Sequence, residues 1–178
     1  FLGSRTAGLW RSADHAAHWA QVGSFPAVAT SLAATATNSW RRQSIGIVFV
    51  VFDPASGAKG RPTPVLYAGV STRETSLFRS TDGGARWSAV PNQPIGLRPN
   101  HMTRGPDGNY YLTYGDEPGP DQMHDGAVWK FSPSDGHWTD ITPIPRHVKS
   151  CGFGCGDVAV DAHDRKILMA STFCHYTP

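Results

Sequence analysis

The chain has 178 residues, a formal net charge of +2 and 39% hydrophobic residues. So small a net charge provides no basic surface for nucleic acid, and no apolar run is long enough to cross a membrane. The 19 glycines and 14 prolines are typical of a turn-rich β fold. We therefore expect a protein whose partners are neither nucleic acid nor membrane.

Short runs rich in β-branched and aromatic residues predict strands along most of the chain. In order, they lie at 47–54, 65–70, 77–80, 101–104, 109–114, 127–132, 138–141, 157–161 and 167–171. Glycine, proline, asparagine and aspartate separate the runs, and no stretch has a convincing helical period. The sequence therefore predicts an all-β fold.

The segment from Ser80 to Trp87 reads S-T-D-G-G-A-R-W, a complete S-x-D-x-G-x-x-W turn of the kind called an Asp-box. Such turns join antiparallel strands at the rim of β-propeller blades. Asp82 at this spacing can accept backbone N–H groups of its own turn, while Gly84 tolerates the positive φ that the turn needs. Trp87 is expected to bury its ring and to keep an N–H donor for a partner.

Two weaker copies of this turn lie on either side. The upstream copy has Ala16 where glycine is expected, and the downstream copy is one residue shorter. The positions to which we assign a structural role in the three copies are Asp14, Trp19, Ser80, Asp82, Gly84, Trp87, Asp135 and Trp138. Three copies in order indicate a repeat.

The aspartates Asp53, Asp107 and Asp161 follow one another at a spacing of 54 residues. A fixed period of this size indicates a propeller or another array, and short strands between turns fit four-stranded blades. The blades we expect are 1–26 (the end of one), 45–90, 100–142 and 155–178 (the start of the next). Propellers typically need about four to eight blades to close a ring. We therefore expect a partial propeller that is an internal piece of a larger protein, and the alternative is a small self-contained β domain.

The order of these motifs resembles glycoside hydrolase family 74, the xyloglucanases. The segments that carry the resemblance are Leu77–Gly84, Trp87–Pro91, Gln93–Pro94, Tyr111–Asp116, Pro118–Pro120, Val128–Phe131, Trp138–Pro143, Gly152–Gly154 and Asp157–Asp161. The similarity covers nearly the whole chain and is weakest at 27–44 and around the cysteines.

The resemblance implies a secreted endo-β-1,4-glucanase that hydrolyses the xyloglucan backbone with inversion. Family members have two seven-bladed propellers facing each other across a cleft, with one catalytic aspartate from each. This chain resembles the middle of the N-terminal propeller, and neither catalytic motif appears in it. We therefore assign no catalytic residue and expect the chain alone to be inactive. Its expected partners are the polysaccharide, the rest of its own propeller and the second propeller.

Several residues are candidates for sugar contacts. Trp40 lies in a polar loop and is not part of a strand-like alternation of apolar residues. Tyr176 lies where the family has a Trp-rich stretch. His101 resembles a His-bearing family segment, although a buried structural role is the alternative. The loop from Tyr114 to 125 connects two strands and can line a groove. The substrate-binding candidates are Trp40, His101, Tyr114, Asp116, Asp121 and Tyr176, with Asp116 and Asp121 also the fallback catalytic pair.

No cofactor or metal is expected. Cys151 and Cys155 lack a second cysteine pair, and the nearby histidines have no ligand spacing.

Two other classes of protein remain open. One is a non-catalytic, sortilin-like binding propeller, which would share the Asp-boxes. The other is a sialidase-like hydrolase, which would need an arginine cluster and a Tyr–Glu pair. Arginines are present, but Glu74 and Glu117 are the only glutamates, and the residues around neither of them fit the required Tyr–Glu pair.

Overall fold

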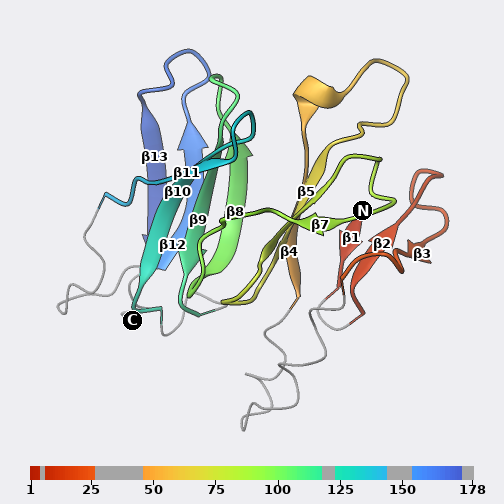
Figure 1. The fold of residues 1–178 in the computed structure, drawn as a ribbon, viewed down its shortest axis with the longest axis horizontal. Helices are drawn as coiled ribbons and strands as arrows, with labels where there is room; N and C mark the ends of the chain where they lie inside the picture. The colour runs from red at the N-terminus through yellow and green to blue at the C-terminus, as the bar shows by residue number, and fades with distance from the viewer. Residues whose placement is uncertain (5–6, 27–45, 118–122, 144–153, 174–178) are drawn as a thin grey trace, which may run out of the picture. The chain divides into compact units, whose positions relative to one another are not determined.

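The computed structural model describes residues 1–4, 7–26, 46–117, 123–143 and 154–173, which form antiparallel sheets (Figure 1). The prediction of an all-β fold is confirmed, since the helical structure of these residues is the one-turn 3-10 segment η1 (Pro54–Ser56). In the part of the chain that is described, no helix has the length and apolarity needed to span a membrane. The chain divides into two compact units: residues 1–71 with 77–90, and residues 72–76 with 91–178.

The first unit contains two sheets. One has the order β1-β2-β3 and the other the order β4-β5-β6-β7. Their strands are β1 (Leu2–Gly3), β2 (Leu9–Arg11), β3 (Ala20–Gln21), β4 (Ile47–Phe52), β5 (Leu66–Val70), β6 (Leu77–Ser80) and β7 (Ser88–Ala89). Every residue of β5 is buried, because this strand pairs on both sides and is covered on both faces.

The two sheets of the first unit share one hydrophobic core. Leu9 of β2 packs in a cluster with Leu66 and Phe78 of the larger sheet and with Trp87. Phe25 adds edge-to-face contacts, with ring centroids 5.4 Å from Phe78 and 5.3 Å from Trp87. Such aromatic pairs stabilise a core beyond the area that they bury.

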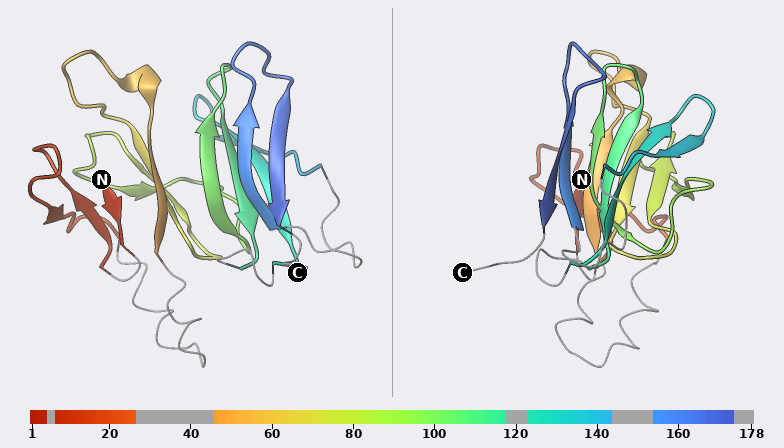
Figure 2. Two further views of the ribbon diagram at one scale, coloured as in Figure 1. Left: turned by 180° about the vertical axis from the view of Figure 1, so that it is seen from behind. Right: turned by 90° about the vertical axis from the view of Figure 1, so that its left-hand side faces the viewer.

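The second unit contains a four-stranded sheet of order β11-β10-β9-β8 and the hairpin β12-β13. The strands are β8 (Arg98–Arg104), β9 (Tyr110–Gly115), β10 (Gly126–Ser132), β11 (His137–Asp140), β12 (Gly154–Val160) and β13 (Leu168–Phe173). Figure 2 shows the hairpin lying against this sheet, with β12 next to β9 and β8. Tyr111 and Val128 of the sheet pack with Cys155 and Val158 of the hairpin.

The three aspartates of the 54-residue period occupy equivalent places. Each follows the first strand of its sheet, and its Oδ1 accepts the backbone N–H two residues further on: Ala55 at 3.0 Å, Asn109 at 3.2 Å and His163 at 2.7 Å. This carboxylate contact replaces a backbone hydrogen bond in the connection that follows the strand. The three equivalent turns agree with the 54-residue spacing seen in the sequence.

The Asp82 turn, residues 80–87, has the hydrogen bonds that its sequence predicts. Oδ1 of Asp82 accepts the Ser80 hydroxyl at 2.9 Å and the Arg86 N–H at 2.8 Å. The Gly84 N–H donates to Ser80 Oγ at 2.8 Å, and the Trp87 indole N–H donates to the Gly84 carbonyl at 3.1 Å. Gly84 has a φ of 87°, so glycine is needed there for its backbone conformation.

The upstream copy repeats the serine and aspartate bonds of the Asp82 turn but fits less well. Oδ1 of Asp14 accepts the His18 N–H at 2.9 Å, and the Ala16 N–H donates to Ser12 Oγ at 2.9 Å. Ala16 has a φ of 70°, a left-handed conformation that strains a residue with a Cβ. Trp19 is 39% exposed, so it does not bury its ring as Trp87 does.

The third copy is a different turn, because it is one residue shorter. Oδ1 of Asp135 accepts the N–H of His137, two residues on, at 3.1 Å. Trp138 stacks on Phe131 with 4.6 Å between ring centroids, and its indole N–H donates to the Pro91 carbonyl at 3.2 Å. The acid and the indole therefore keep structural roles with altered partners.

Replacing Trp87 by alanine should lower the free energy of unfolding by about 3–5 kcal/mol, because a buried aromatic side chain leaves a cavity. Trp19→Ala, the matched change in the upstream copy, should cost about 1 kcal/mol or less, since that ring is partly exposed. Denaturant unfolding of both variants measures the difference. Equal losses would show that the two indoles do not differ in burial.

Acid should destabilise the fold through the Asp turns. The backbone N–H of His18 is the main cause that lowers the pKa of Asp14 to about 2, and that of Arg86 is the main cause that lowers the pKa of Asp82. A carboxyl whose pKa is lower in the folded state contributes stability above its unfolded pKa, and this contribution is lost as the pH falls. The melting temperature should therefore fall between about pH 4 and pH 2, and less so in Asp82→Asn, which removes one titrating group. An identical fall in both proteins would contradict this account.

Candidate functional site

The polar residues of the second unit gather where β8 and β12 begin and β9 ends. Antiparallel pairing places the start of β8 beside the end of β9, and the start of β12 packs against both, opposite the Asp107 and Asp161 turns (Figure 1). The loop between β9 and β10 lies at the same end. We define the Asp116 loop by its described residues, 115–117 and 123–126.

The Asp116 loop is closed by its own acids. Oδ1 of Asp116 accepts the His124 N–H at 2.9 Å, and the Asp116 N–H donates to the Asp125 carbonyl at 3.0 Å. Met123 is 2% exposed and fills space left by two glycines, since a Cβ at Gly115 would come within 2.8 Å of its Cε. The carboxylate of Asp116 therefore supports the loop.

A histidine–aspartate pair lies beside this loop. His101 Nε2 is 3.2 Å from Asp157 Oδ1, and the side chains are 44% and 67% exposed. His101 is thus half-exposed and not buried, and it is accessible to a ligand. Two bonds hold β12 against the sheet here, from Asn100 Nδ2 to the Cys155 carbonyl at 2.7 Å and from Thr113 Oγ1 to the Gly156 carbonyl at 2.9 Å.

Tyr114 does not reach this surface. Its side chain is fully buried, its hydroxyl has no hydrogen-bond partner among the described residues, and burial raises its pKa. The site that we describe therefore excludes Tyr114, although the sequence proposed it as a sugar contact. It lies in β9, whose residues are all buried because both faces of the strand are covered.

The other predicted contacts, Trp40, Asp121 and Tyr176, lie outside the described residues. Of the six candidates, the structure therefore brings two, His101 and Asp116, to one end of the second unit. It adds a residue that the sequence does not single out: the Arg73 guanidinium donates to the Asp116 carbonyl from 43 positions away. A bond to a backbone carbonyl leaves no pattern in the sequence.

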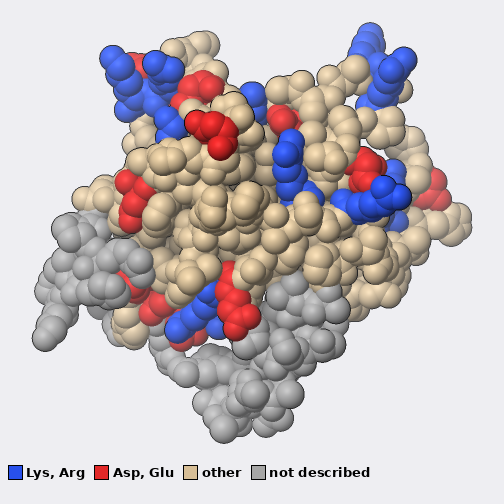
Figure 3. All heavy atoms as spheres, viewed as in Figure 1, with Lys and Arg blue, Asp and Glu red and all other residues tan. Residues whose placement is uncertain are grey.

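The site offers little for metal or thiolate chemistry. Within the described ranges, no group of three or more His, Cys, Asp or Glu side chains could hold a metal ion. Burial raises the pKa of the Cys155 thiol to about 11, so it remains protonated and is a poor nucleophile. Figure 3 shows acidic and basic side chains interspersed on one face, without an extended field of one sign.

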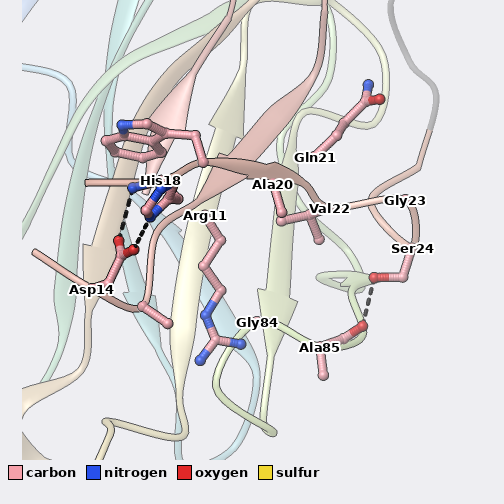
Figure 4. A pocket seen from close by; sticks show the side chains of 12 residues that line it. Arg11, Asp14, His18, Ala20, Gln21, Val22, Gly23, Ser24, Gly84 and Ala85 are labelled. Carbon is pink, nitrogen blue, oxygen red and sulfur yellow. Dashed lines mark hydrogen bonds and ion pairs between the residues drawn. The ribbon is translucent and has the colours of Figure 1, made fainter. Parts of the chain in front are cut away.

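The first unit has an open hollow of about 670 Å³ between the Asp14 turn and the backbone at Gly84 (Figure 4). Arg11 and Gln21 line it, together with the pair formed by Asp14 Oδ2 and His18 Nδ1, 2.6 Å apart. Both oxygens of Asp14 already have partners in the turn. The hollow therefore provides no free carboxylate for acid–base chemistry among its lining residues.

Comparisons with known proteins identify relatives of this chain. No family model matches the chain. A xyloglucanase of Paenibacillus is 41% identical over the whole chain, and one of Acetivibrio thermocellus is 42% identical. The crystal structure of the GH74 xyloglucanase from Xanthomonas campestris covers 99% of the chain with a TM-score of 0.86 and 54% identity.

The chain belongs to glycoside hydrolase family 74. The resemblance seen in its motifs is confirmed, and the GH74 enzyme of Niastella koreensis agrees at a TM-score of 0.73 and 29% identity. The chain spans 17% of the Paenibacillus relative and 21% of the Acetivibrio one. These relatives do not favour the sortilin-like or sialidase-like alternatives.

In this family 74 segment, Tyr114→Phe tests whether the buried hydroxyl has any binding role. We expect the free energy of unfolding to rise by about 1 kcal/mol or stay unchanged, because an unpartnered buried hydroxyl is destabilising. Xyloglucan affinity should not change. The control Tyr111→Phe removes a 3.1 Å bond to Asp107 and should lower stability by about 1 kcal/mol. Weaker xyloglucan binding by Tyr114→Phe would restore Tyr114 as a sugar contact.

Proposed function

We propose that this chain is a segment of a secreted enzyme that hydrolyses the β-1,4-glucan backbone of xyloglucan. The observation that carries the proposal is the 41–54% identity to xyloglucanases from three bacteria over nearly the whole chain. The substrate is then a hydroxyl-rich polysaccharide, and no cofactor is needed.

The segment supplies binding surface and not the catalytic pair. Inverting hydrolysis needs two carboxyl groups about 6.5–9.5 Å apart, so that a water molecule fits between them and the sugar. The Asp116 carboxylate is engaged by the His124 N–H, and the Asp157 carboxylate by His101 and the Val158 N–H. Neither is poised as a free base. The catalytic aspartates belong to other parts of the parent protein, one in this propeller and one in a second propeller.

The contribution of the segment to substrate binding is polar. The half-exposed His101–Asp157 pair offers both a donor and an acceptor to sugar hydroxyls, and the Asp116 loop lies at the same end of the strands. Trp40 and Tyr176, which the sequence predicts as sugar contacts, would add faces for sugar stacking. Binding to this surface alone should be weak, because the opposing half of the cleft is absent.

The experiment is reducing-sugar release from xyloglucan by the parent protein and by the isolated chain. We expect release by the parent and none by the chain, because groups that stabilise the transition-state charge are missing from the chain. Activity in the isolated chain would show that the catalytic pair lies within it, with Asp116 and Asp121 as the first residues to mutate. An inactive parent would refute the xyloglucanase proposal.

A further inference from the structure

The segment 72–76 connects β5 to β6 but packs with the second unit. The backbone N–H and the hydroxyl of Ser76 donate to Gln93 Oε1 at 2.8 and 3.2 Å. The Gly96 N–H donates to the Arg73 carbonyl at 2.6 Å. The backbone on either side of the Arg73 side chain is therefore fixed within the second unit.

From this fixed backbone, Arg73 extends to the Asp116 loop. Its Nε and Nη2 donate to the Asp116 carbonyl at 3.1 and 2.5 Å, and Nη2 lies 3.4 Å from Glu117 Oε1. Two N–H groups of one guanidinium on one carbonyl define the direction of that peptide as well as its distance. Arg73 thus holds the loop just where β9 ends and the loop begins.

The charges around this contact are balanced. Arg98 lies within electrostatic reach, and burial, followed by the nearby charge of Arg73, lowers its pKa. Glu117 and Asp116 act in the opposite direction on the same group. Two guanidinium groups and two carboxylates therefore form one cluster, and loss of Arg73 would leave an excess of negative charge on the loop.

We propose that Arg73 is a positioning residue that fixes the Asp116 loop for polysaccharide binding. The inference rests on the proposed function, since it assigns the loop a part in the substrate surface. Arg73 itself acts through the Asp116 backbone and its role does not require contact with sugar. The Asp116 carboxylate closes the loop from within, Met123 packs against Gly154 of β12, and Arg73 holds the loop from a segment 43 positions away.

The first test needs no substrate. Hydrogen exchange of the His124 and Gly126 amides, which both donate within the loop, should speed up about tenfold or more in Arg73→Gln of the 178-residue chain. Arg165→Gln, the control, makes the same charge change in an exposed turn at the opposite end of the strands and should leave these amides unchanged. Arg73→Lys keeps the positive charge but loses the two N–H groups that bind one carbonyl together, so the exchange rate of these amides should lie between those of the wild type and Arg73→Gln. Unchanged exchange in Arg73→Gln would overturn the proposal.

The second test uses the parent protein and xyloglucan. Arg73→Gln should raise KM about three- to tenfold with kcat changed less than about twofold, as expected for loss of binding that is shared by ground and transition states. Arg73→Lys should recover part of the affinity, and Arg165→Gln should match the wild type. Faster loop exchange with an unchanged KM would overturn the proposal while the proposed function stands. A wild-type parent without activity would overturn both, and the exchange experiment would still report the loop contact.

Discussion

Aspartate carboxylates that accept backbone N–H groups close the short strands of this chain into sheets. Asp53, Asp107 and Asp161 do so after the first strand of three sheets, and Asp82 does so before the last strand of one. Such short strands bury little surface individually, so each turn must bring its two strands into register at low cost. A local carboxylate acceptor fixes the backbone directly after the strand, even where the connection is as long as residues 53–65 between β4 and β5. The sheets, their cores and the position of the site all depend on these turns.

The turns also explain why the polar site lies where it does. Because the shorter turns occupy one end of the strands in the second unit, the longer connections lie at the other end, with the Asp116 loop and His101. Residues at this end are held by bonds within the Asp116 loop and also by contacts between elements, such as Asn100 to the Cys155 carbonyl. The same division of stable scaffold and variable loops is common in binding proteins.

The sequence predicts local features well and tertiary contacts poorly. Alternation and turn residues predict the strands from β4 to β13 other than β7, and the 54-residue period predicts equivalent turns. The two- and three-residue strands β1, β2, β3 and β7 are too short to carry a readable alternation. Burial of Tyr114 and exposure of Trp19 depend on what packs over each residue, which a local pattern does not contain. The Arg73 contact is invisible for a further reason: its acceptor is a carbonyl that every residue possesses.

The contacts of residues 72–76 determine how late in synthesis this segment can fold. Residues that precede β6 find their partners in Gln93, Gly96 and Asp116, which leave the ribosome later. The β5–β6 connection can therefore reach its final conformation only after β9 has been made, although both strands that it joins are complete long before. Domains that fold from the N-terminus during translation normally finish one unit before starting the next. Here the connection of the early β5–β6 hairpin can be completed only after the later β8–β9 hairpin has been synthesised. The conformation of this short segment therefore reports a late step in folding.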